Sequence, residues 1–184
     1  MRFKQIKHPK DNLELQSLYK EIAESGVQGS EEGVPINLFT SQSERPDILQ
    51  AGWAFFKGTL LQGQLPPTLK QMISMTIALQ NNCRYCVVAH TFALEAMGVP
   101  KEVIESCASD PELSLVPPPQ RAIIKFALKA ARDPKSINDE DFQTLHNFGL
   151  SDGEIMEVIM VAACAIFTDF WADISGLPVD WEKN

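Results

Sequence analysis

Apolar residues recur every three or four positions through successive stretches of this chain, and proline or glycine separates one stretch from the next. Such spacing places the apolar side chains on one face of an α-helix. The alternation with β-branched residues that indicates β-strands is not sustained anywhere. We therefore expect an all-α, single-domain helical bundle of about seven to eight helices, at residues 11–24, 46–61, 66–82, 83–97, 101–107, 120–132, 138–147 and 151–175.

Short sequence signals mark the ends of several of these helices. Ser151-Asp152-Gly153-Glu154 resembles a capping box at a helix start. Gly98-Val99-Pro100 and Gly176-Leu177-Pro178 are typical of helix C-termini, and their likeness suggests a duplicated helical hairpin. The polar, glycine-containing stretch 26–33 is typical of a linker. We therefore expect residues 1–32 to form a helical arm and linker, and residues 33–184 to form the main helical domain.

Composition excludes several classes of function. Hydrophobic residues make up 45% of the 184 residues and charged residues 22%, as in ordinary soluble domains. We find no apolar run near the roughly 18 residues that span a bilayer, and no signal peptide, so we expect a cytoplasmic protein with no membrane partner. A formal charge of −8, without a local cluster of Lys and Arg, argues against nucleic acid as a partner.

Two thiols and an imidazole stand out in the helix expected at residues 83–97. Spacings of three, four and seven place Cys83, Cys86 and His90 within about 60° of one another on a helix. In a Cys-x-x-Cys pair, the second thiol can capture a sulfenic acid formed on the first. The helix N-terminus favours a thiolate at Cys83, whereas the nearby imidazole favours one at Cys86, so either thiol could be the nucleophile.

These residues also have other interpretations. A Cys-x-x-Cys pair can simply be two small buried side chains, but His90 favours redox chemistry. A zinc site needs further ligands, and we predict no metal site because the remaining candidates show no matching second pair: His8, His146, Cys107 and Cys164. We expect Cys107 and Cys164 to lie in the core, and His146 near a helix end or on the surface.

Carboxylates also occur where they need an explanation. Asp169 and Asp173 lie four residues apart on a mostly apolar helix, where a carboxylate usually has a partner. Either of them could orient a histidine or an arginine. Glu154 is explained by its capping position, three residues after Ser151.

The stretch Asn82-Cys83-Arg84-Tyr85-Cys86-Val87-Val88-Ala89-His90, closed by Gly98, resembles a known signature. It is similar to the Cys-x-x-Cys-x-x-x-His motif of the alkylhydroperoxidase D-like branch of the carboxymuconolactone decarboxylase superfamily. Flanking segments resemble the peroxidase-related subgroup of that branch: Gly33-Val34-Pro35 with Asn37, the helix near Trp53 and Phe56, and residues 150–155. The resemblance covers about residues 33–178.

The resemblance implies an all-helical subunit that forms homo-oligomers, commonly trimers or hexamers, and that reduces hydroperoxides without a bound cofactor. It implies that Cys86 is the peroxidatic thiol, that Cys83 is the resolving thiol, and that His90 belongs to the proton relay. An external dithiol would then reduce the disulfide.

One position departs from the pattern of this family. The family relay includes a glutamate about twelve residues before the first cysteine, where this chain has Gln71, whose amide can hydrogen-bond but cannot shuttle a proton. The relay is then weakened, or Asp169 or Asp173 replaces the glutamate, or the thiols serve disulfide exchange more than peroxide reduction.

The sequence therefore favours a thiol-dependent hydroperoxide or disulfide reductase. Two alternatives remain open at this point. One is a cofactor-free enzyme of the carboxymuconolactone decarboxylase type, which would depend on acid–base groups rather than on paired thiols. The other is a non-catalytic oligomeric protein on the same scaffold, for which Gln71 is the best support.

Overall fold

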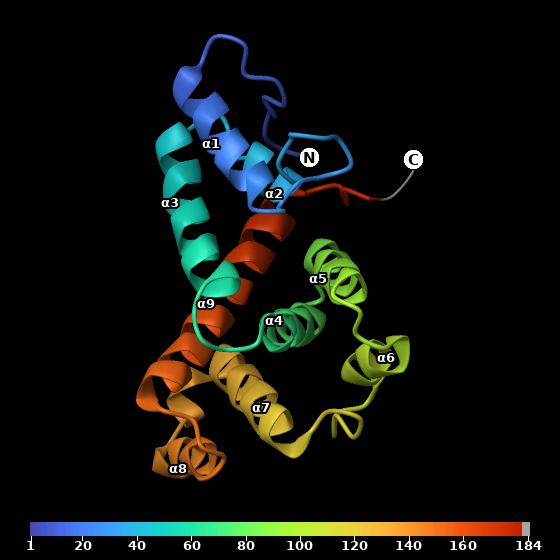
Figure 1. The fold of residues 1–184 in the computed structure, drawn as a ribbon, viewed down its shortest axis with the longest axis vertical. Coiled ribbons are helices and arrows are strands. Elements are labelled where there is room, and N and C mark those ends of the chain that lie inside the picture. Colours follow the sequence, from blue (N-terminus) through green and yellow to red (C-terminus); the bar gives the residue numbers. More distant parts are fainter. Residues whose placement is uncertain (182–184) are drawn as a thin grey trace.

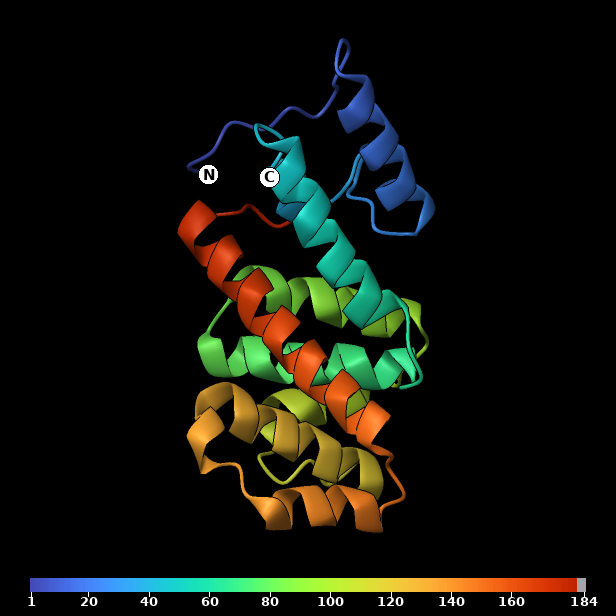
Figure 2. The same cartoon turned by 90° about the vertical axis from the view of Figure 1, so that its left-hand side faces the viewer.

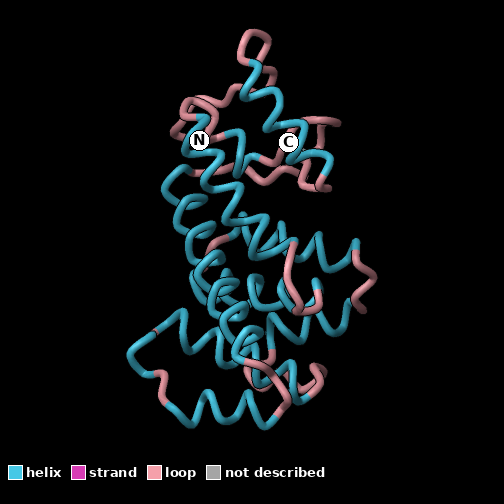
Figure 3. The backbone as a smooth tube through the Cα atoms, turned by 60° about the vertical axis from the view of Figure 1, so that its left-hand side comes forward, coloured by secondary structure: helices cyan, strands magenta, loops and turns pink. Residues whose placement is uncertain are grey.

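The computed structural model describes residues 1–181, and within that range it contains helices and no β-strand (Figure 3). The expected all-α class is confirmed. The α-helices span Leu13–Glu24 (α1), Asn37–Thr40 (α2), Pro46–Phe56 (α3), Pro67–Asn81 (α4), Arg84–Ala96 (α5), Lys101–Ser109 (α6), Pro118–Arg132 (α7), Asp139–Asn147 (α8) and Asp152–Ser175 (α9). A π-helical turn, Lys57–Leu61 (η1), continues α3, and a 3-10 turn, Pro134–Ser136 (η2), follows α7.

The expected number of helices was one too low, because α2 was not predicted. This helix has four residues, which is too short for a periodic pattern to show in the sequence. All four of its residues are buried, so tertiary packing rather than local propensity holds α2 in place.

The signals at helix ends act as the sequence suggested. Proline occupies the start of α3, α4 and α7, where the missing amide hydrogen costs no hydrogen bond. Left-handed glycines follow α5 and α9, with φ of 75° at Gly98 and 63° at Gly176. Ser151 and Glu154 form the expected capping box at the start of α9.

The longest helix, α9, organises the molecule. It runs obliquely through the middle of the molecule, and α4 and α7 pack against it (Figure 1). Turned by 90°, α5, α4, α7 and α8 lie one below the other, with α9 crossing in front of α5 and α4 (Figure 2). Helix α4 is the centre of this arrangement, since it also contacts α5, α6 and η1. The N-terminal segment lies beside the end of α9, where the backbone amide of Arg2 donates to the carbonyl oxygen of Ser175 at 2.8 Å.

Helix α9 corrects one expectation from the sequence. In the described part of the chain it is the one helix long and apolar enough to cross a membrane by length and composition alone, with a mean hydropathy of 1.8 over its best window. Half of that window is buried inside the protein, as in the core helix of a globular fold. The helix also carries a face of exposed apolar side chains: Met156, Ile159, Met160, Ile166, Phe170 and Ile174.

A buried ion pair fixes the turn before α4. Lys70 is 2% exposed, and its Nζ donates to the carbonyl oxygens of Thr59 and Gln62 and pairs with the Glu157 carboxylate from α9. Glu157 in turn accepts the backbone amide of Gln64 at 2.8 Å. These contacts join η1, α4 and α9.

Candidate active site

The turn between α4 and α5 places the first cysteine of the motif. Asn82 adopts a left-handed conformation with φ of 58°, which an asparagine tolerates better than most residues. Cys83 then follows in an extended conformation as the N-cap of α5 rather than within the helix. The expectation that Cys83 lies inside a continuous helical run was therefore wrong. The thiols still meet, because an N-cap side chain lies over the third residue of its helix, which here is Cys86.

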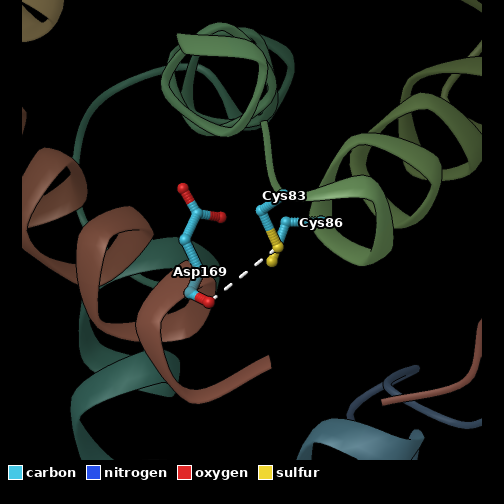
Figure 4. A group of neighbouring side chains, drawn as sticks. All are labelled: Cys83, Cys86 and Asp169. Atoms are coloured by element: carbon cyan, nitrogen blue, oxygen red, sulfur yellow. Dashed lines mark hydrogen bonds between the residues drawn. The ribbon is translucent and has the colours of Figure 1, made fainter. Parts of the chain in front are cut away.

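A carboxylate from α9 completes a buried cluster with the two thiols (Figure 4). The sulfurs of Cys83 and Cys86 and a carboxylate oxygen of Asp169 lie within 4.8 Å of one another. The Cys83 Sγ also lies 3.9 Å from the backbone oxygen of Asp169. Asn81, at the end of α4, donates from Nδ2 to Asp169 Oδ2 at 2.8 Å and so fixes the orientation of the carboxylate.

Burial and mutual repulsion set the charges in this cluster. The pKa of Cys86 is raised well above its usual range by hydrogen bonding with the Cys83 sulfur, by burial and by the Asp169 carboxylate. Burial also raises the pKa of Asp169, against the opposing effect of Asn81. The expectation of a thiolate at Cys86 stabilised by a nearby imidazole therefore does not match the resting site, in which Cys86 is a thiol.

His90 lies at the same site but contacts α4 instead of a thiol. Its Nδ1 is 2.6 Å from Oε1 of Gln71, and an amide oxygen only accepts hydrogen bonds. Nδ1 therefore carries the proton, and Nε2 is left with its lone pair. Burial lowers the pKa of His90 to about 4, so the imidazole is neutral at pH 7. Gln71 thus selects the tautomer of His90 without supplying a charge.

A cavity of about 320 Å³ opens beside these groups, and its walls are mostly apolar. Cys86, His90 and Gln71 line it, together with Phe56, Phe92 and Trp181 among others. No Lys, Arg, Asp or Glu side chain is part of the lining in the described range. The cavity therefore suits a neutral, apolar molecule of small size.

The segment after α9 closes one side of the cavity. Tyr85 donates from its hydroxyl to Asp180 Oδ2 at 2.6 Å, and the backbone amide of Asn37 donates to Asp180 Oδ1 at 2.9 Å. These bonds hold Trp181 against Phe92, with the ring centroids 4.5 Å apart and nearly parallel. Asn81, Tyr85, Asp180 and Trp181 were not predicted as site residues. Asn81 and Tyr85 are close to the cysteines in the sequence, which could have indicated their role. Asp180 and Trp181 have no such signal.

The remaining candidates lie elsewhere. Asp173 is exposed and is not part of the thiol cluster, although its charge contributes to the raised pKa of Asp169. Cys107 and Cys164 are buried in the core, as expected, and burial raises the pKa of Cys164 to about 11. His146 lies at the end of α8, where Nδ1 is 2.9 Å from the carbonyl oxygen of Leu150.

Parts of this chain are similar to known proteins. Residues 46–112 match the Carboxymuconolactone decarboxylase family. This range contains α3 to α6 and the two cysteines of the cluster, Cys83 and Cys86. An alkyl hydroperoxide reductase of Mycobacterium tuberculosis is 43% identical over 51 residues, a stretch that is 28% of this chain and 15% of that protein. The chain therefore matches only a small part of that relative.

Two solved structures are similar over almost the whole chain. A peroxidase-related protein from Silicibacter sp. TM1040 has a TM-score of 0.83 at 22% identity, over 96% of this chain and 90% of that one. An alkylhydroperoxidase AhpD core protein from Ralstonia eutropha JMP134 has a TM-score of 0.79 at 25% identity, over 95% of this chain and 92% of that one. Together these comparisons support a likeness of this chain to the alkylhydroperoxidase D-like branch of the carboxymuconolactone decarboxylase superfamily.

Proposed function

We propose that this protein is a thiol-dependent reductase of organic hydroperoxides, in which Cys86 attacks the peroxide and Cys83 closes the disulfide. The observation that carries this proposal is the position of Cys86 between the cavity and the second thiol. Cys86 lines the cavity, whereas Cys83 is not among the described lining residues. A hydroperoxide in the cavity therefore meets Cys86 first, with the sulfur of Cys83 within 4.8 Å behind it.

In the first step, the Cys86 sulfur attacks the terminal oxygen of the hydroperoxide. The O–O bond breaks, Cys86 becomes a sulfenic acid, and the alkoxide leaves as an alcohol after it takes up the proton that the Cys86 thiol loses. Because Cys86 rests as a thiol, a base has to accept its proton as the S–O bond forms. Asp169 is placed for this role beside both sulfurs, and Nε2 of His90 is a second acceptor at the cavity.

In the second step, the Cys83 sulfur attacks the Cys86 sulfur. The S–O bond breaks, Asp169 accepts the proton that the Cys83 thiol loses and passes it to the departing hydroxide, and water leaves. The two thiols have then supplied two electrons and become a disulfide, while the hydroperoxide has become an alcohol and water. An external dithiol resets the site by thiol–disulfide exchange.

The cavity also separates this function from the decarboxylase alternative. A carboxylated lactone needs cationic partners for its carboxylates, and no Lys or Arg lines the cavity in the described residues. A neutral apolar hydroperoxide needs none. The similarity to a mycobacterial alkyl hydroperoxide reductase supports the same substrate class.

The test uses serine variants of each cysteine with cumene hydroperoxide as the probe. Wild-type protein should consume one equivalent of peroxide in a single turnover. Mass spectrometry should then show that the peptide containing Cys83 and Cys86 has lost two hydrogens. Cys86→Ser should consume none, whereas Cys83→Ser should form a sulfenic acid at Cys86 that dimedone traps. Cys107→Ser, outside the site, serves as the matched control and should behave as wild type.

Two results would contradict parts of this proposal. Unchanged peroxide consumption by Cys86→Ser and Cys83→Ser would remove the peroxidase function altogether. A sulfenic acid trapped at Cys83 in Cys86→Ser would keep the function but exchange the roles of the two thiols.

We also propose that further copies of this chain cover the exposed apolar face of α9. Met156, Met160, Phe170 and Ile174 follow the spacing of a helix stripe and are 45–64% exposed. Exposed stripes of this kind pack well against a second copy of the same helix. Light scattering during gel filtration should show an oligomer for wild type and a monomer for Phe170→Glu. Phe148→Glu, at an exposed phenylalanine outside α9, is the control and should remain oligomeric.

A further inference from the structure

The buried cluster behind the cavity has a second property besides the proximity of its thiols. Its three members are at most 3% exposed. Each of them has one atom that can donate an electron pair to a metal ion, and these three atoms lie within 4.8 Å of one another. The donors are the sulfurs of Cys83 and Cys86 and a carboxylate oxygen of Asp169 (Figure 4). The third donor comes from α9, 86 positions after Cys83, so no spacing rule in the sequence could have grouped it with the thiols.

An unsatisfied atom points to a missing partner at this place. Asp169 Oδ1 is buried and has no hydrogen-bond partner in the described residues, although Oδ2 receives the amide of Asn81. An unpaired buried carboxylate oxygen is costly, and buried charges usually pair or bind a cation. No Lys or Arg side chain forms an ion pair with Asp169 in the described part of the protein.

The donor set matches one class of ligand well. Zinc binds cysteine sulfur at about 2.3 Å and carboxylate oxygen at about 2.0–2.2 Å, which puts tetrahedral donors about 3.5–3.8 Å apart. Donors that already lie within 4.8 Å reach that spacing through small side-chain rotations. Three protein ligands with one open position are the usual arrangement of a reactive zinc site. Asn81 supplies the outer hydrogen bond that orients the carboxylate ligand.

We propose that the reduced protein binds one thiophilic divalent cation, such as Zn²⁺, through Cys83, Cys86 and Asp169, with the fourth position open to the cavity. The cation replaces the protons of the two thiols and offsets two of the three negative charges that the buried cluster cannot hold alone. Because Cys86 lines the cavity, the ion enters by the same path as the peroxide.

Metal binding and disulfide formation exclude each other. The same two sulfurs cannot bond to one another and hold the ion at the same time, so the cation protects the pair from oxidation and inhibits the peroxidase reaction proposed above. The binding itself requires only the reduced cysteines and Asp169, and it does not depend on that reaction.

Cobalt(II) titration of the reduced, full-length protein tests this inference, since tetrahedral cobalt–thiolate sites absorb strongly. We expect saturation at one ion per chain, with sulfur-to-cobalt charge-transfer absorption and visible tetrahedral bands. Cys83→Ser and diamide-oxidised wild type should show neither. Asn81→Ala should bind about tenfold more weakly, as for other losses of an outer hydrogen bond. Cys107→Ser should bind as wild type does.

Asp169→Asn is the decisive variant, because it keeps the shape of the side chain and removes its charge. Its binding should be weaker than that of Asn81→Ala, and equal binding by Asp169→Asn and wild type would overturn the inference. X-ray absorption of the zinc-loaded wild type tests the same point without a variant and should show two sulfur ligands and lighter oxygen ligands. A protein that reduces cumene hydroperoxide but gives no cobalt spectrum would overturn this inference and leave the proposed function standing.

Discussion

Replacing Gln71 by glutamate would put a carboxylate where the structure has an amide oxygen. That oxygen lies 2.6 Å from Nδ1 of His90, inside the protein. The wild-type imidazole is neutral at pH 7, because burial lowers its pKa to about 4 and no charged group opposes that effect. Gln71→Glu supplies the opposing charge with almost no change in shape. We expect the pKa of His90 to rise in this variant.

The size of the change follows from the geometry. Hydrogen-bonded groups at this separation have charge centres about 4 Å apart, which is worth about 4 kcal/mol at an effective dielectric constant of about 20. That energy corresponds to an increase of about a thousandfold in the proton affinity of His90. Burial of the new carboxylate opposes part of the gain, so we expect an increase between about tenfold and a thousandfold.

Proton NMR of the His90 ring during a pH titration measures this directly. The other two histidines, His8 and His146, lie in exposed positions and serve as internal references. The titration midpoint of His90 should move from the acidic range toward neutrality in Gln71→Glu. Gln71→Met, which has no acceptor, should leave it acidic. If the titration midpoint of His90 in Gln71→Glu stays within one pH unit of the wild-type value, a change of less than tenfold in proton affinity, the assignment of the Gln71–His90 contact is refuted.

Three further predictions concern stability, measured by urea unfolding. The pKa of His90 is lowered from 6.5 to about 4 in the fold, so stability should fall by about 3 kcal/mol as pH drops from 6.5 to 4, and His90→Gln should remove that slope. Glu157→Gln leaves Lys70 buried without its partner and should cost about 3–5 kcal/mol; a loss under 1 kcal/mol would show that the pair is not needed. Ile73→Ala, at a fully buried position of α4, should cost about 2–5 kcal/mol, whereas Leu115→Ala, at an exposed position outside α9, should stay within about 0.5 kcal/mol of wild type.

The sequence predicted local features of the fold well. Of the nine α-helices in residues 1–181, eight have a periodic apolar face, a proline start or a glycine end, and each of these acts within one or two turns. The ninth, α2, has no such pattern, since burial under neighbouring elements holds it. The extended conformation of Cys83 also escaped prediction, because the sequence placed Cys83 at the first position of a helix, whereas the left-handed Asn82 leaves it as the N-cap.

At the site, the sequence singled out Cys83, Cys86, His90, Gln71 and Asp169, but it could not say how they interact. Asp169 and Asp173 were equivalent candidates on one helix. The rotation of α9 against α4 and α5 decides between them, since it buries Asp169 at the thiols and leaves Asp173 exposed. The packing of α5 on α4 likewise gives His90 the amide of Gln71 as a partner.

By itself, the sequence determined the helices and the nearness of the two thiols, because both depend on interactions between residues a few positions apart. Only the tertiary structure decided which carboxylate joins the thiols, which partner His90 has, and which sulfur faces the cavity. It also decided the protonation of Cys86, Asp169 and His90, since their pKa values depend on how far packing between distant helices removes them from water.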